Sequence, residues 1–348
     1  MDDFARRPAA DRRAFIEEAA GRRDVTPIII EKDLWVCWTL RRLTMAAEVG
    51  GHLTFKGGTS LSKAFGIISR FSEDIDLTIS RSAPLVEKVP SPMEEGISGK
   101  ERERRTRALK LAAQGFVAEV ALPALAREIE AALRSSDGWT LELDPDDKDR
   151  QTLLFAYPQT AGYGLGYGND YGGAGGGDIK PRVKLEFGAR GDAETSEPRQ
   201  VRPYLADDFP DEFADPTTEV ATLAVERTYW EKVTILHALF HNGKLREGMS
   251  RHYHDVLMLD SAGVTEQALA RLDLLDSVVR NKSLMFSDAS ASYDTAARGT
   301  LRLSAGDAVE AQLRKDYEAM AEMFMGEPMP FEQLLKELAA LEAKINDA

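Results

Sequence analysis

Residues 53–79 contain Leu53-Thr-Phe-Lys-Gly-Gly-Thr-Ser-Leu-Ser-Lys-Ala-Phe-Gly-Ile-Ile-Ser-Arg-Phe-Ser-Glu-Asp-Ile-Asp-Leu-Thr-Ile79, a pattern that predicts a strand, a glycine turn, a short helix and a second strand. Side chains alternate between the faces of a strand, so the apolar residues at positions 75, 77 and 79 share one face, while Asp74 and Asp76 share the other. The Cα atoms of these acids should lie about 6 to 7 Å apart. This separation suits oxygen ligands that converge on a hard cation such as Mg²⁺. We therefore predict that Asp74 and Asp76 form the chemical centre of the chain.

The glycine turn upstream of the acids is a candidate phosphate-binding site. Gly57 and Gly58 end the first predicted strand and leave backbone N–H groups exposed. Thr59 and Ser60 follow them and are expected to cap a helix over residues 61–68. A lone Gly-Gly-Thr is usually a plain turn, and a lone Asp-x-Asp is usually a solvated strand face or loop. Their combination is the arrangement that metal-dependent phosphoryl transfer requires, because triphosphate and metal must meet at one sheet edge.

A second predicted strand, residues 182–187, supplies a third carboxylate. Its apolar residues at positions 183, 185 and 187 face inward, so Lys184 and Glu186 share the other face. An exposed glutamate on a strand is usually only a solvated side chain, and the alternation by itself leaves both interpretations of Glu186 open.

Several segments resemble the AbiEii toxin family within the polymerase-β-like nucleotidyltransferases. The first two family motifs are matched by Lys56-Gly-Gly-Thr-Ser-Leu-Ser-Lys63 and Ser72-Glu-Asp-Ile-Asp-Leu77. Further family-like stretches run from about residue 28 to about residue 330: Glu31-Lys-Asp-Leu-Trp-Val36, Val183-Lys-Leu-Glu-Phe-Gly188, Tyr229-Trp-Glu-Lys232 and Arg251-His-Tyr-His-Asp255. The spacing from Gly58 to Asp74 is slightly longer than in the general superfamily, which we interpret as a feature of this branch.

The resemblance implies an α+β fold: a polymerase-β-like nucleotidyltransferase core with a mixed sheet, then a mainly helical C-terminal lobe. It implies that Asp74, Asp76 and Glu186 hold two Mg²⁺ (or Mn²⁺) ions, and that Lys232 neutralises charge from the second lobe. Candidate nucleotide and phosphate contacts are Lys56, Gly57, Gly58, Thr59, Ser60, Lys63, Ser72 and Asp255. The resemblance further implies a toxin of a toxin-antitoxin pair with a role in phage defence, an NTP substrate, an antitoxin partner encoded nearby, and transfer to the 3′ end of tRNA.

The composition restricts the partners of the chain. Its 348 residues carry 44 basic and 58 acidic side chains, a net charge of −14, so the whole chain does not attract nucleic acid or an anionic membrane. The densest basic cluster is Lys100, Arg102, Arg104, Arg105 and Arg107, which is either a solvated helix start or a polynucleotide contact. The single cysteine, Cys37, the acidic N-terminal segment and the lack of about 18 uninterrupted apolar residues predict a soluble cytoplasmic protein with no membrane contact.

The periodicity predicts two domains, a core over residues 1–215 and a helical lobe over 216–348. In the core we expect helices over 8–22 and 27–45, a loop over 82–98, a long helix to residue 133, and strands over 139–143 and 152–157. Residues 162–177 are rich in glycine and are expected to form a mobile hairpin or insertion. In the lobe, Thr228 is expected to cap a helix that Gly243 ends, and Arg251 and Asp255 are spaced as a helical ion pair. Helices over 308–324 and 331–345 follow.

Two other functions remain open on the sequence. Nucleotide transfer onto a protein hydroxyl would suit an acidic surface better than transfer onto RNA. A nucleotide-binding or protein-binding module without turnover is supported by the acidic charge and the glycine-rich insertion, although all three carboxylates have the right strand phase. A zinc site among the histidines is disfavoured, because no His-Glu-x-x-His pattern or nearby cysteine accompanies them.

Overall fold

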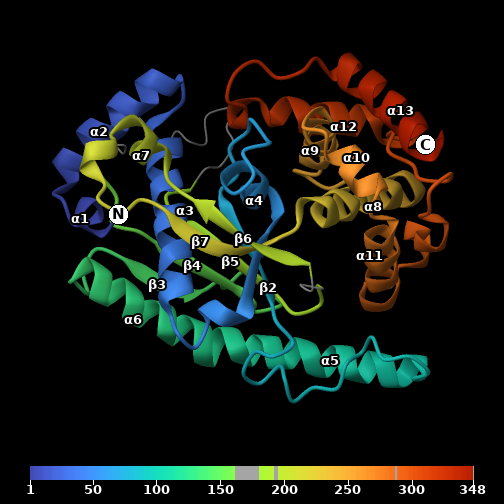
Figure 1. The fold of residues 1–348 in the computed structure, drawn as a ribbon, viewed down its shortest axis with the longest axis horizontal. Helices are drawn as coiled ribbons and strands as arrows, with labels where there is room; N and C mark the ends of the chain where they lie inside the picture. Colours follow the sequence, from blue (N-terminus) through green and yellow to red (C-terminus); the bar gives the residue numbers. More distant parts are fainter. Residues whose placement is uncertain (161–179, 192–194, 287, 348) are drawn as a thin grey trace. The chain divides into compact units, whose positions relative to one another are not determined.

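The computed structural model describes residues 1–160, 180–191, 195–286 and 288–347. The glycine-rich segment predicted to be an insertion lies outside these residues. The chain forms two compact units (Figure 1). The first contains residues 1–64, 71–91 and 96–222, and the second contains residues 65–70, 92–95 and 223–348.

A seven-stranded mixed sheet forms the centre of the first unit, in the order β3-β4-β5-β2-β1-β7-β6. Strand β2 pairs antiparallel with β1 and parallel with β5, while β7 pairs parallel with β1. The strands are β1 (Leu53–Lys56), β2 (Asp74–Ile79), β3 (Thr140–Leu143), β4 (Thr152–Ala156), β5 (Val183–Gly188), β6 (Ser196–Val201) and β7 (Thr218–Leu223). The predicted α+β fold with a mixed sheet is confirmed.

Strands β6 and β7 were not predicted, and the helical pattern does not begin near residue 216 as expected. Residues 218–223 form β7, whose buried positions alternate with the exposed Glu219 and Ala221 before both Thr222 and Leu223 become buried. The first long helix of the second unit begins at Val225. The alternation from Thr218 to Thr222 was a usable strand signal, but the strongly helical pattern just after it dominated the interpretation.

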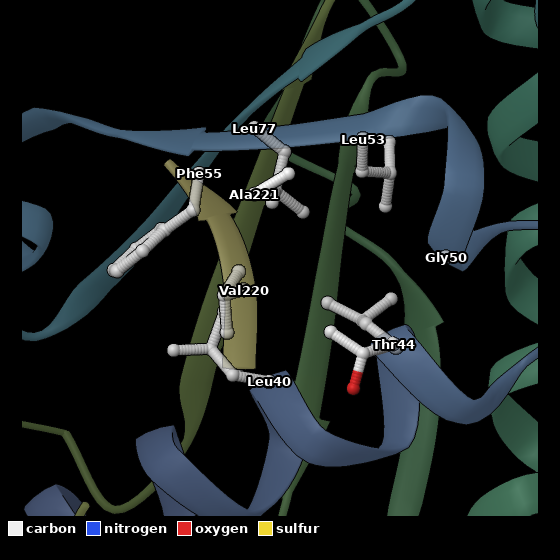
Figure 2. A pocket seen from close by; sticks show the side chains of 9 residues that line it. Leu40, Thr44, Gly50, Leu53, Phe55, Leu77, Val220 and Ala221 are labelled. Carbon is white, nitrogen blue, oxygen red and sulfur yellow. The ribbon is translucent and has the colours of Figure 1, made fainter. Parts of the chain in front are cut away.

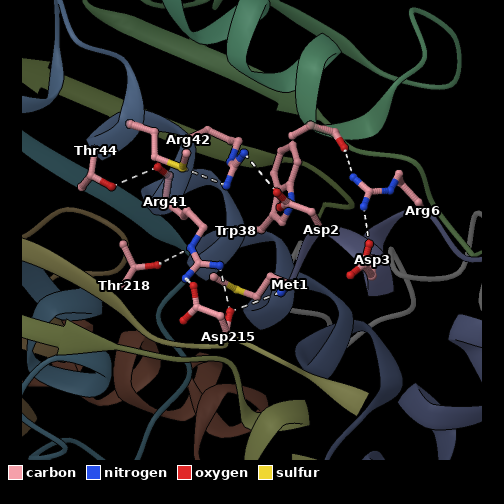
Figure 3. Close-up of polar contacts among 12 residues, drawn as sticks. Met1, Asp2, Asp3, Arg6, Trp38, Arg41, Arg42, Thr44, Asp215 and Thr218 are labelled. Carbon is pink, nitrogen blue, oxygen red and sulfur yellow. Dashed lines mark hydrogen bonds and ion pairs between the residues drawn. The ribbon is translucent and has the colours of Figure 1, made fainter. Parts of the chain in front are cut away.

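The helices of the first unit are α1 (Asp2–Ala5), α2 (Ala9–Arg23), α3 (Pro27–Met45), α4 (Gly57–Lys63), α5 (Gly99–Gly115), α6 (Leu122–Leu133) and α7 (Tyr204–Asp208), with short turns η1 (Gly50–His52) and η4 (Pro210–Glu212). Helix α3 packs on β2 and β5, as its apolar circumference predicted. Trp38 stacks on Phe155 of β4, with ring centroids 5.9 Å apart. Figure 3 shows how α1 is fastened to α3: Asp2 accepts a hydrogen bond of 2.9 Å from Trp38 Nε1 and lies 3.3 Å from Arg42.

An apolar pocket lies between the end of α3 and the sheet (Figure 2). Its volume is about 270 Å³, including space open to solvent, and its lining is mainly aliphatic, with Leu40, Leu53 and Val220 among the side chains. Ligand pockets usually carry a few convergent polar groups, which this mainly aliphatic lining does not supply. Leu77 lines this pocket and Asp76 precedes it in β2, so the pocket and the acids are on opposite faces of the sheet. We interpret it as a packing gap.

The predicted long helix is present as α5, a π-helical turn η2 (Phe116–Ala121) and α6, in direct succession. Its basic start forms ion pairs along the helix itself: Arg104 and Arg105 with Glu101, and Arg107 with Glu103. Among the described residues, this is the one helix long and apolar enough to cross a membrane, and 39% of its most apolar window is buried. A core helix of a soluble protein passes the same test, so this is weak evidence for a membrane span.

The second unit is mainly helical, as predicted. Its helices are α8 (Val225–Asn242), α9 (Ser250–Ser261), α10 (Val264–Leu269), α11 (Leu272–Met285), α12 (Asp307–Ala319) and α13 (Phe331–Asp347), with short turns η5 (Ala289–Ala291), η6 (Tyr293–Thr295) and η7 (Ala321–Met323). Gly243 ends α8 in a left-handed conformation, as expected. The cap prediction for Thr228 is wrong, because α8 begins three residues earlier and the Thr228 hydroxyl donates to the Ala224 carbonyl oxygen within the first turn.

Candidate active site

The pairing of β2 with β5 brings the three predicted acids to one face of the sheet. The two strands are parallel neighbours, and their register pairs Asp74 with Lys184 and Asp76 with Glu186. In both strands these four residues are partly exposed, while the residues that alternate with them are buried. Paired residues of adjacent strands point to the same side. We call Asp74, Asp76, Lys184 and Glu186 the acid face.

The acid face concentrates negative charge. Burial, together with the charges of Glu73 and Glu186, raises the pKa of Asp74 to about 6. Lys184 donates a hydrogen bond to Glu186, and the buried Lys32 pairs with Glu73. Within the described ranges, no three acidic, histidine or cysteine side chains are already grouped around one point as metal ligands. The role of Asp74, Asp76 and Glu186 as metal ligands therefore stays a prediction that rests on their common face.

Gly57 is required where β1 meets Asp76. Lys56 is the register partner of Asp76, and Gly57 follows it with a φ of +80°, which residues with a side chain rarely adopt. A Cβ atom at Gly57 would lie 2.0 Å from Asp76 Oδ2. The lack of a side chain at this position thus allows both the turn and the close approach of the Asp76 carboxylate.

Gly57→Ala is expected to lower nucleotide transfer about tenfold or more, because the new methyl group displaces the Asp76 carboxylate. Gly138→Ala is the matched control: Gly138 has a φ of +83° in the same unit, and a Cβ atom there would have nothing within 4 Å. The backbone strain of about 1 to 3 kcal/mol should be common to both variants. A transfer assay with thermal unfolding separates the effects, and equal activity of the two variants would contradict the displacement.

The short helix after Gly57 begins earlier than predicted. Helix α4 begins at Gly57 with Lys56 as its N-cap, so Thr59 and Ser60 lie inside it and do not cap it. Thr59 Oγ1 donates to the Asp74 carbonyl oxygen at 2.5 Å and lies 3.0 Å from Ser72 Oγ. The side chains of Thr59 and Ser60 are both buried: Thr59 contacts the start of β2, and the Ser60 hydroxyl donates to the Gly57 carbonyl oxygen at 2.8 Å. Their contact with phosphate stays a prediction.

Lys63 anchors α4 to α3 and α7. Its ammonium lies 2.6 Å from Asp33 Oδ1 and 3.6 Å from the centroid of the Tyr204 ring, and both charged side chains are buried. Burial alone would lower the pKa of Lys63, but the charge of Asp33 raises it. The Tyr204 N–H donates to the second Asp33 oxygen at 2.6 Å. The predicted phosphate contact of Lys63 is untested, and in this structure its charge is already compensated.

In the second unit, Asp255 is the centre of a buried charge cluster. Arg70 donates to both of its oxygens at 2.8 Å, and Lys232 Nζ donates to Oδ2 at 2.8 Å. Among the described contacts these ion pairs replace the expected pair with Arg251. Burial alone would raise the pKa of Asp255, but the two cations hold it well below its usual range. Burial lowers the pKa of Lys232, and when this lysine is protonated the trio carries two positive charges against one negative.

Comparison of the sequence with protein-family models shows which family the chain belongs to. The model described as "Nucleotidyl transferase AbiEii toxin, Type IV TA system" matches residues 38–337. The chain belongs to the AbiEii family. It is therefore a nucleotidyltransferase toxin of a type IV toxin-antitoxin system, with an NTP substrate and an antitoxin partner. The resemblance inferred from the motifs and the prediction of an enzyme are both confirmed.

Among solved structures, this AbiEii chain is similar to MenT4, a nucleotidyltransferase toxin from Mycobacterium tuberculosis. The two share 17% sequence identity and a TM-score of 0.42, over 96% of this chain and 98% of that chain. At these values the likeness says nothing about the substrate of this AbiEii toxin. A search among curated proteins gave no match.

The structure of this AbiEii chain also shows polar partners that the sequence analysis did not assign to the site. Arg70 binds Asp255, which lies 185 positions away, and Lys184 binds Glu186 on the acid face. The position of Lys184, in phase with Glu186, was a signal for the second contact, whereas Arg70 had none. His252 Nδ1 lies 3.5 Å from Lys232 Nζ. Burial holds the pKa of the His252 ring well below its usual range. That neutral ring contacts the charge cluster of the second unit.

Proposed function

We propose that this AbiEii toxin transfers a nucleoside monophosphate from an NTP to the 3′ end of tRNA in a reaction that depends on Mg²⁺ or Mn²⁺. The observation that supports this proposal best is the register of β2 and β5, which sets Glu186 beside Asp76 on the face that also carries Asp74. We further propose that the toxin acts in the cytoplasm, in defence against phage.

The acid face fits divalent cations by its chemistry. Its donors are carboxylate oxygens, which hard cations prefer. The pKa of Asp74 is raised by burial and by the negative charges of Glu73 and Glu186, and a bound cation would offset those charges. Asp74, Asp76 and Glu186 would hold the ions. Bound there, the ions would neutralise the triphosphate and activate the attacking hydroxyl.

The remaining residues would bind and orient the triphosphate. The first backbone N–H groups of α4, at Gly57 and Gly58, would donate to a phosphate oxygen. Lys232 would stabilise the charge that develops on the leaving pyrophosphate, and the net positive charge that its cluster with Arg70 and Asp255 carries when Lys232 is protonated supports that role.

Transfer onto a protein hydroxyl is the second candidate, and the charge of the chain favours it. The net charge of −14 opposes RNA binding, and three arginines of the densest basic cluster are already paired with Glu101 or Glu103. An RNA acceptor would have to be bound by other local cations.

The acceptor can be identified by labelling. The toxin is incubated with each α-labelled NTP and Mg²⁺, together with total tRNA, tRNA whose 3′ end has been oxidised by periodate, or protein from a lysate. We expect label in intact tRNA, none in oxidised tRNA, and dependence on the divalent cation. Label in protein alone would establish the second candidate. Binding of NTP without transfer to any acceptor would establish a module without turnover.

A further inference from the structure

Lys184 is a cation placed among the acids of the acid face. It is the register partner of Asp74 on the neighbouring strand, and it precedes Glu186 by two residues, so both β5 side chains point to the same side. Its ammonium donates a hydrogen bond to Glu186 Oε1. One of the three carboxylates proposed to hold metal is therefore already bound to a cation of the chain itself.

Two lysines that form ion pairs with acids at or next to the acid face, Lys32 and Lys184, differ in how easily they can leave. Lys32 pairs with Glu73 and is only 3% exposed, so separating that pair would leave a buried charge. The side chains of Lys184 and Glu186 are 37% and 41% exposed. Ion pairs at this exposure contribute little to the free energy of folding, and the flexible lysine side chain can rotate away so that water solvates its ammonium. Of these two lysines, Lys184 is the one that a bound cation could displace.

We propose that Lys184 is an internal competitor for the divalent cation: its ammonium holds Glu186, and the ion must displace it to complete the acid face. The proposal rests on the metal-dependent function proposed above. It makes Lys184 a positioning residue that sets the cation concentration at which the site fills. The opposite role, in which Lys184 orients Glu186 toward the metal, would change the affinity with the opposite sign.

The test measures Mn²⁺ binding to the full-length protein without nucleotide, by calorimetry and by the paramagnetic signal of free Mn²⁺. Lys184→Met is expected to bind Mn²⁺ about fivefold more tightly than the unchanged protein, the effect of losing one partly exposed ion pair. Lys88→Met is the matched control, because Lys88 is exposed in the same unit and its replacement changes the net charge equally. Thermal unfolding checks that each variant is folded.

A second comparison assigns the effect to Glu186. If competition acts through this carboxylate, Lys184→Met should tighten binding much less when Glu186→Gln is also present. Equal or weaker Mn²⁺ binding by Lys184→Met would overturn the competitor role. If Asp76→Asn still removes Mn²⁺ binding in that case, the proposed metal-dependent function stands and only the competitor role of Lys184 fails. If no Mn²⁺ binding depends on Asp76, the metal site itself fails and the inference fails with it.

Discussion

Asp76→Asn is expected to lower the rate of nucleotide transfer by about a thousandfold or more while leaving the protein folded. In the sheet register, Asp76 of β2 lies between Lys56 of β1 and Glu186 of β5, so it is the central carboxylate of the acid face. An amide oxygen carries no charge and is a weaker ligand for hard cations than a carboxylate. The asparagine has the same shape and Asp76 is partly exposed, so the free energy of unfolding should change by about 1 kcal/mol or less.

The measurements are a transfer assay, thermal unfolding and growth after induction. Asp146→Asn is the control, because Asp146 is exposed in the turn between β3 and β4 and its replacement is chemically identical. Toxicity should disappear with Asp76→Asn and persist with the control. Undiminished toxicity in a folded Asp76→Asn protein would show that the toxin harms cells by binding and not by catalysis.

Lys232→Met is expected to lower kcat about a hundredfold or more. A lysine that stabilises charge developing on the triphosphate acts on the transition state, so its loss should appear in kcat. Methionine keeps the length of the buried stem. Asp255 retains both hydrogen bonds from Arg70, so the loss of stability should be smaller than the roughly 3 to 5 kcal/mol for an uncompensated buried charge.

Stability and catalysis can be separated in the same experiment. Lys244→Met removes a lysine that is 60% exposed and lies 3.3 Å from Asp288, also in the second unit. Both variants are assayed at a temperature well below their melting transitions. Lower kcat only in Lys232→Met supports the catalytic role. A lower melting temperature with unchanged kcat would limit Lys232 to charge balance around Asp255.

The sequence by itself determined those features that depend on neighbouring residues. Alternation in residues 74–79 and 182–187 predicted which side chains share a strand face, because that period is a property of the extended backbone. Apolar residues around much of the circumference of α3 predicted that this helix is buried. The glycine at position 243 predicted the end of α8. The motifs predicted the AbiEii family, which the family model confirms.

Only the tertiary structure decided which polar groups from distant positions of the chain meet. The Thr59 hydroxyl donates a hydrogen bond to the Asp74 carbonyl oxygen, 15 positions along the chain. The sequence analysis expected Thr59 to cap a helix because capping rules consider only neighbouring residues. Lys63 meets Asp33 and Arg70 meets Asp255, and in each case the partner is a distant position of the chain. Buried charges require compensation but do not specify its source in the sequence, because any segment that packs nearby can supply it. The partners of these ions are therefore a property of the packed fold.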